Sequence, residues 1–156
     1  MASYGISTAG TLVKYCAGAT RPTAGYTLIP GCKALPALFN DPNMLETTTL
    51  EATKNKTYTD GLSDSGGSAT ITVNDYAEFR TEWNACVSAY ESMTSGQQMW
   101  FEFSYPAGSG MDSFYFPGRP LPLGFGGADV DSVLENNANI APEGDYVFAA
   151  ASTVSA

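Results

Sequence analysis

The chain has 156 residues, with seven basic residues against sixteen acidic ones and a formal net charge of −9 at pH 7. An acidic chain of this kind offers no broad surface for clamping phosphates, which argues against ordinary DNA or RNA binding and against docking on anionic membranes. It contains no histidine, so histidine-based catalytic sets and histidine metal ligands are excluded.

The first half of the chain predicts strands, because apolar and polar residues alternate there with a period of two. The signal is weak in three segments, 11–17, 26–35 and 44–52. It is strong at 68–74, where Ala69, Ile71 and Val73 share one face. Such alternation is typical of antiparallel strands that are buried on one face only.

One segment breaks this alternation and predicts a helix of about residues 75–95. Its bulky apolar residues recur at intervals of three and four, which draws one apolar stripe along a helix. These residues are Tyr76, Phe79, Trp83, Cys86, Val87, Tyr90 and Met93. Asp75 is predicted as the N-cap, with Glu78 completing a capping box, and Gly96 as the C-terminal stop.

Strands return after the helix. Residues 97–105 alternate clearly, and the stretch Pro-Ala-Gly-Ser-Gly at 106–110 predicts a turn into a further strand at 113–116. A last weak strand is predicted at 146–150. No repeat or linker interrupts the chain, so residues 1–156 are predicted as a single domain. The predicted fold class is mainly β: a small antiparallel β-sandwich or barrel with one flanking α-helix.

No pattern in the sequence points to a catalytic, cofactor-binding or metal site. The three cysteines form no CxxC pair, and we interpret them as small buried hydrophobic residues in a reducing compartment. Asp129 and Asp131 lack the rest of an EF-hand loop. We therefore predict no enzyme activity and no cofactor; a carboxylate-based hydrolase using Glu46, Glu51 or Glu102 is the alternative. We also expect no secretion signal and no membrane insertion.

Positive charge is concentrated in the first eighty residues, and Arg119 is the one basic residue after them. The predicted solvent faces of the two clearest strands carry none; they comprise Ser68, Thr70, Thr72, Gln98, Glu102 and Ser104. A face without basic side chains can line a channel through which DNA slides, because nothing there attracts phosphate. An ordinary solvated sheet face has the same composition, so composition leaves both interpretations open.

The order of the segments resembles one known family. Met-Leu-Glu-Thr-Thr-Thr-Leu at 44–50 is followed by Thr-Tyr-Thr-Asp-Gly-Leu at 57–62, Asp-Ser-Gly at 64–66, the strand at 69–73 and the predicted helix. This series resembles the major tail tube proteins of long-tailed (siphovirus-like) bacteriophages. The resemblance covers about residues 26–150, and the tube protein of type VI secretion systems shares the general architecture.

The resemblance implies a structural virion protein, assembled in the host bacterial cytoplasm, whose hexameric rings stack into the tail tube for genome ejection. It implies stacking through a long loop at about 51–67, with candidate inter-ring contacts at Glu51, Lys54, Lys56 and Tyr58. The candidate lumen-facing residues are Thr70, Thr72, Glu102 and Ser104. The implied partners are other copies of the chain and the tape measure, tail terminator and distal tail proteins, while phage DNA passes without specific binding.

Two alternatives remain at this point. One is a type VI secretion-like tube protein. The other is a small β-sandwich module for carbohydrate binding or adhesion, in which Trp83 and Trp100 would be platforms for sugar rings. Trp83 lies on the apolar stripe of the predicted helix, which favours a core position for that residue.

Overall fold

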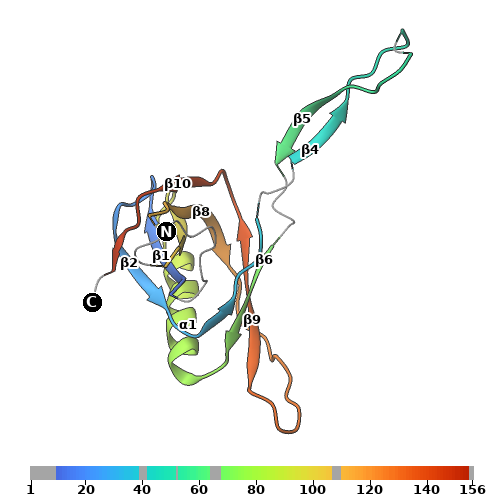
Figure 1. Cartoon of the computed structure of the whole chain (residues 1–156). Helices are drawn as coiled ribbons and strands as arrows, with labels where there is room; N and C mark the ends of the chain where they lie inside the picture. The colour runs from blue at the N-terminus through green and yellow to red at the C-terminus, as the bar shows by residue number, and fades with distance from the viewer. Residues whose placement is uncertain (1–9, 39–41, 52, 64–67, 107–109, 155–156) are drawn as a thin grey trace, which may run out of the picture.

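The computed structural model describes residues 10–38, 42–51, 53–63, 68–106 and 110–154 (Figure 1). These residues form one helix and a series of strands. In chain order the elements are β1 (Leu12–Gly18), β2 (Ala24–Ile29), β3 (Cys32–Ala34), β4 (Pro42–Glu46), β5 (Tyr58–Ser63), β6 (Ala69–Asn74), α1 (Ala77–Glu91), β7 (Gln98–Ser104), β8 (Ser113–Pro120), β9 (Glu135–Pro142), β10 (Val147–Ala149) and β11 (Thr153–Val154).

Nine of the described strands belong to one sheet, in the order β11-β2-β1-β7-β8-β9-β6-β3, with β10 paired to β8. All of these pairings are antiparallel except that of β11 with β2. The longest register joins β1 to β7, from Leu12 opposite Ser104 to Gly18 opposite Gln98. The prediction of a mainly antiparallel β fold is therefore confirmed.

The sheet curves around a single core that α1 completes on one side (Figure 1). Ile71 of β6 and Ile140 of β9 belong to the same buried cluster as Phe101 of β7 and Phe116 of β8. Trp83 of α1 joins this cluster and is fully buried, and its indole Nε1 donates a hydrogen bond to the carbonyl of Leu121 at 2.9 Å. Ile29 of β2 and Val73 of β6, which lie near opposite ends of the sheet order, also belong to this cluster. Strands far apart in the sheet order thus share one core, as a small β-sandwich requires.

The helix confirms the centre of its predicted apolar stripe, although Tyr76 of that stripe lies before the helix and is 40% exposed. Both predicted ends are wrong: the helix runs from Ala77 to Glu91, and its C-cap is Ser92 and not Gly96. Phe79, Trp83 and Cys86 are its fully buried residues. The N-cap is Tyr76, which makes no side-chain capping hydrogen bond. Asp75 was wrongly predicted as the cap, because its carboxylate instead accepts two hydrogen bonds, both at 2.6 Å, from the guanidinium of Arg80. A bidentate ion pair of this kind competes successfully with a backbone amide for the carboxylate.

Several strand predictions need correction. The strand expected at 26–35 divides into β2 and β3, because Gly31 between them has a positive φ of 81°. The strand expected at 44–52 ends at Glu46. Strands β5 and β9 were not predicted, since their segments are rich in Asp, Asn, Gly and Pro, which strands usually avoid. The pairing of β7 with β8 confirms the predicted reversal, although residues 107–109 of its turn lie outside the described residues.

Candidate functional site

The hairpin of β4 and β5 stands apart from the main sheet. The two strands form their own two-stranded antiparallel sheet, with Glu46 opposite Tyr58, and they project away from the rest of the chain (Figure 1). The prediction of a loop at about 51–67 is therefore wrong for Tyr58–Ser63, which is strand β5. Residues 52 and 64–67 of that segment lie outside the described residues.

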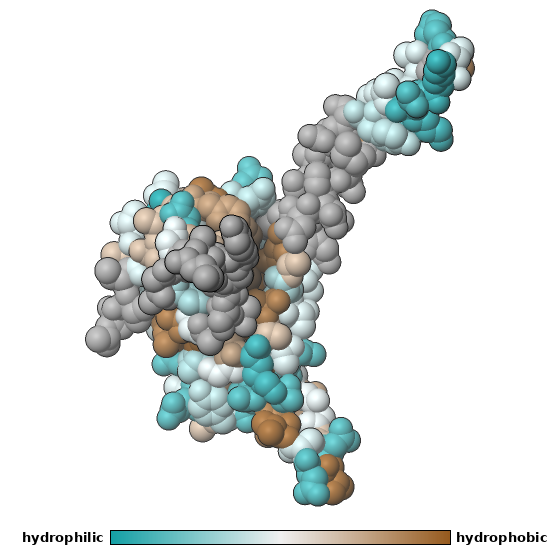
Figure 2. Space-filling model, in the orientation of Figure 1, coloured by the Kyte–Doolittle hydropathy of each residue, from teal (hydrophilic) through white to brown (hydrophobic). Residues whose placement is uncertain are grey.

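The hairpin brings together the four residues predicted as inter-ring contacts. Glu51, Lys54, Lys56 and Tyr58 are all exposed, and the end of the hairpin is mainly hydrophilic in Figure 2. Lys56 Nζ lies 3.9 Å from Glu46 Oε1, and both side chains are more than half exposed. An exposed pair at this distance contributes little to stability, so it leaves the lysine available to other carboxylates.

The turn of the hairpin is held by threonines. The amide of Thr47 donates to the carbonyl of Thr57 at 2.7 Å, and the amide of Thr57 donates to the hydroxyl of Thr48 at 2.8 Å. Leu50 at the turn is fully exposed. These local bonds shape the hairpin without any contribution from the main sheet.

A second candidate surface is the outward face of β6 and β9. Thr70 lies opposite Asn139 and Thr72 opposite Asn137, and Thr70 Oγ1 donates to Asn139 Oδ1 at 2.8 Å. The side chains of Thr70 and Asn137 are exposed, while Ile71 and Ala138 between them point into the core. Thr70, Thr72, Asn137 and Asn139 give this face an uncharged polar centre, and the charged Glu135 lies on the same face at the start of β9.

One ion pair borders this polar face. Lys33 Nζ of β3 lies 3.2 Å from Glu135 Oε1 at the start of β9, and both side chains are more than two-fifths exposed. The charge of this lysine is therefore balanced within the same chain.

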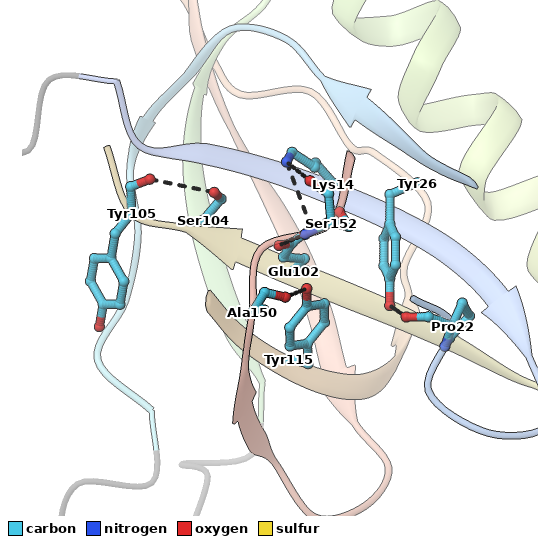
Figure 3. A network of polar contacts seen from close by, with 9 residues as sticks. All are labelled: Lys14, Pro22, Tyr26, Glu102, Ser104, Tyr105, Tyr115, Ala150 and Ser152. Carbon is cyan, nitrogen blue, oxygen red and sulfur yellow. Dashed lines mark hydrogen bonds and ion pairs between the residues drawn. The ribbon is translucent and has the colours of Figure 1, made fainter. Parts of the chain in front are cut away.

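The expectation that Glu102 and Ser104 face a channel is wrong for the described structure. Glu102 is fully buried and Ser104 is 6% exposed. The alternation along β7 suggested a solvent face, but the segment after β10 covers that face of the sheet (Figure 3). Strand β7 is largely buried on both faces. This burial is determined by the segments that pack around the strand and not by the strand's own sequence.

Glu102 instead forms a buried ionic cluster. Lys14 Nζ of β1 lies 3.7 Å from Glu102 Oε1 and donates to the carbonyl of Ser152 at 3.4 Å. The Ser152 hydroxyl donates to Glu102 Oε1, and the Ser152 amide donates to Oε2 at 3.1 Å. Figure 3 shows these side chains converging beneath the segment that leads to β11. The cluster ties that segment to the two central strands.

Protonation within the cluster follows from its hydrogen bonds. Burial alone would raise the pKa of Glu102, but hydrogen bonds to its carboxylate, foremost the two from Ser152, together outweigh burial and hold the pKa of this carboxyl below its usual value. Burial and the nearby Glu102 carboxylate raise the pKa of Tyr115 to about 12. Tyr115 therefore stays protonated, and its hydroxyl donates to the carbonyl of Ala150 at 2.6 Å.

Sequence reasoning missed Lys14 and Ser152 as members of this cluster. Lys14 stands opposite Glu102 only through the pairing of β1 with β7, which joins residues far apart in the chain. A lone lysine between apolar neighbours on a predicted strand was the available signal.

The residues considered for a hydrolase site or a sugar-binding site do not come together in the structure. Glu46 and Glu51 lie on the hairpin, whereas Glu102 is buried in the main sheet, so these carboxylates form no hydrolase site. Trp83 is fully buried and cannot be a sugar platform. Burial raises the pKa of the thiol of Cys86 to about 12, which fits its interpretation as a small buried hydrophobic residue. Cys16 and Cys32 are only partly buried, so the same interpretation is wrong for them in its claim of burial.

No group of three or more cysteine or carboxylate side chains among the described residues is arranged to hold a metal ion. Over the same residues, no helix is long and apolar enough to cross a membrane.

Comparison of the sequence with protein-family models and with curated proteins finds no match. Solved structures do resemble the chain in fold. A chain of the anti-feeding prophage baseplate, six-fold symmetrised, has a TM-score of 0.64 at 13% identity, covering 96% of this chain and 98% of that one. A chain from the tail of an empty GTA particle, with C6 symmetry, has a TM-score of 0.58 at 16% identity, covering 90% and 96%. A chain of the tube-terminating cap of the anti-feeding prophage has a TM-score of 0.56 at 14% identity, covering 97% and 95%.

Proposed function

We propose that the chain is a structural subunit of a phage tail tube, and not an enzyme: hexameric rings of it stack into the conduit for genome ejection. The observation that carries this proposal is a fold shared over at least 90% of the chain with chains of six-fold symmetric particles, one of them a tail. Residues 1–156 would then act as one tube domain within a virion, with tape measure, terminator and distal tail proteins as further partners.

The projecting hairpin supports this assignment on physical grounds. An isolated two-stranded sheet is marginally stable in water, so β4 and β5 gain most from packing against another molecule. Each subunit carries a net charge of −9, so stacked rings repel one another unless basic side chains meet acidic neighbours. Lys54 and Lys56 are exposed on this hairpin and suit that role.

A subunit at one end of a tube is the second candidate function. Two of the similar chains belong to a baseplate and to a tube-terminating cap. An end subunit would form rings but would not extend them, because one of its two faces would be shaped for a different protein. A subunit of a type VI secretion-like tube is a third candidate function with the same architecture.

Electron microscopy of the concentrated, purified chain separates these functions. Tubes with six-fold symmetry support the tube subunit, and single six-fold rings support the end subunit. A chain that stays monomeric at all concentrations contradicts both. Glycan-array binding by such a monomer would favour the carbohydrate-binding module instead.

Reversing the charge of the hairpin lysines is expected to block stacking. The double variant Lys54→Glu/Lys56→Glu should keep the melting temperature of the subunit, because both side chains are exposed. It should raise the concentration needed for tube formation by about tenfold or more, since like charges facing each other across an interface are strongly unfavourable. Sedimentation of assembled material against protein concentration measures this effect.

The matched control is Lys54→Arg/Lys56→Arg, which keeps both charges and should assemble as the wild type does. Added salt should weaken wild-type stacking, because exposed ion pairs are screened. Tubes of normal length from the charge-reversed variant would show that these lysines do not hold rings together.

The polar face of β6 and β9 is the proposed wall of the lumen. Thr70→Lys/Thr72→Lys is expected to slow genome ejection, because each lysine facing DNA adds a phosphate contact that repeats in every ring. The control Thr70→Gln/Thr72→Gln adds similar length without charge and should eject normally. The measurement is DNA release from virions built with each variant. Wild-type release rates from the lysine variant would remove this face from the lumen.

A further inference from the structure

The loop between β8 and β9 presents apolar side chains to solvent. Phe125 is 82% exposed, Val130 93% and Val133 67%, and we call these three residues the apolar loop. The loop is anchored at its root, because Asn136 Nδ2 donates to the carbonyl of Gly124 at 2.8 Å. Three large exposed apolar side chains within one loop that is anchored at its root indicate a surface that binds another molecule.

An aromatic cavity lies at the other end of the subunit. Its volume is about 280 Å³, and its lining includes Leu35, Leu38, Phe103, Tyr105, Tyr146 and Phe148. It opens to solvent, since Tyr105 is 36% exposed and Phe148 52%. A cavity of about 150 Å³ accepts a benzene ring, so this one has room for a phenylalanine side chain.

The apolar loop cannot fill the cavity of its own subunit. Strand β8 begins at Ser113, opposite Ala149 of β10 beside the cavity, and ends at Pro120, where the loop begins. Eight extended residues span roughly 25 Å. In Figure 1 the loop lies at the bottom of the view, below β9, whereas β10 lies at the top. A protruding group and a recess at opposite ends of one molecule form a head-to-tail pair, which generates an open stack.

We propose that the apolar loop of one copy inserts into the aromatic cavity of another copy in the neighbouring ring. This inference rests on the proposed function and names a second surface, besides the hairpin, that joins successive rings. It assigns Phe125 to the cavity, where its ring contacts the aromatic side chains of the lining.

The size of the contact argues for another copy within a ring assembly as the occupant. The Phe125 ring can bury about 150–250 Å² and each valine side chain is smaller, whereas a stable pair of proteins usually buries about 800 Å² on each partner. One such contact is too small to hold two free subunits together. Six of them, formed at once between two rings, reinforce one another through their high effective concentration.

Cysteine cross-linking tests the contact directly. Ala37 lines the cavity and is exposed, and Val130 is the most exposed residue of the apolar loop. The variant Ala37→Cys/Val130→Cys cannot close a disulfide within one subunit, because the two positions lie at opposite ends. Mild oxidation of its assembled tubes should give a ladder of covalent multimers on a non-reducing gel. The wild type and each single variant should give no ladder, which controls for the three native cysteines.

A charge placed on the apolar loop provides the second test. Phe125→Asp/Val130→Asp should fold normally, because both side chains are exposed, but should need about tenfold or more protein to form tubes. The control Asn84→Asp/Ala85→Asp adds the same charge on the exposed face of α1 and should assemble normally. Tubes without a disulfide ladder, or normal assembly of the loop variant, would overturn this inference and leave the tube function standing. A wild type that forms neither rings nor tubes would overturn both.

Discussion

Replacing Glu102 with alanine is expected to cost about 3–5 kcal/mol of unfolding free energy. The substitution leaves Lys14, which is 3% exposed, as a buried charge without its carboxylate partner. It also removes the acceptor for the hydroxyl and amide of Ser152, which hold the last described segment against the sheet. Urea unfolding followed by tryptophan fluorescence measures the loss.

The double variant Lys14→Met/Glu102→Leu separates the cost of an unpaired charge from the value of the pair. Because replacing both partners by apolar side chains of similar size is often neutral or stabilising, the double variant should recover most of the loss. If the double variant is as unstable as Glu102→Ala, the ion pair is not the main source of stability, and the hydrogen bonds between Glu102 and Ser152 account for the loss.

The pH dependence of this variant series has a definite sign. The pKa of Glu102 is lowered in the folded state, so the stability it contributes is present above its unfolded pKa of about 4.3 and is lost as pH falls through the lower folded pKa. The stability difference between wild type and Glu102→Gln should therefore be constant near neutral pH and shrink in acid. A difference that grows on acidification would contradict the lowered pKa.

Replacing Trp83 with alanine is expected to cost about 3–5 kcal/mol, because it empties a fully buried site at the centre of the core. Trp83 stacks on Phe79, with ring centroids 6.1 Å apart, and donates to the carbonyl of Leu121. The substitution thus removes the contact between α1 and the segment after β8. The measurement is the midpoint and slope of denaturant unfolding.

The control for this variant is Trp83→Phe, which keeps a large aromatic ring but loses the indole hydrogen bond. It should cost less than the alanine variant, on the order of 1–3 kcal/mol for a carbonyl left without its donor and a smaller ring. Equal losses for both variants would assign the effect to the hydrogen bond, and a loss below about 1 kcal/mol for alanine would mean that the core closes over the gap.

The sequence predicted those features that depend on neighbouring residues. The intervals between Phe79, Trp83 and Cys86 are fixed by the period of a helix, so the buried stripe could be predicted without any tertiary information. The alternation in 68–74 likewise predicted the buried and exposed faces of β6. Both features were confirmed by the structure.

The features that sequence reasoning missed depend on distant residues. Glu102 alternates with apolar neighbours as a solvent-facing residue would, and its burial depends on contacts with Lys14 and Ser152, which lie far from it in the chain. Asp75 is a residue type that often caps helices, but its carboxylate accepts hydrogen bonds from Arg80, in the first turn of the helix, instead. Strand β9 contains three asparagines, and its pairing with both β6 and β8 overrides their low strand propensity.

The separation of the hairpin from the main sheet has a thermodynamic consequence. Because β4 and β5 share no strand pairing with the rest of the described sheet, the hairpin can open while the core stays folded. The chain then consists of two cooperative units with different free energies of opening, and a melting curve dominated by the core says little about the hairpin. If the hairpin joins successive rings, the conformational entropy that it loses is lost on assembly and not on folding. The strength of the tube and the stability of its subunit can then change independently through mutation.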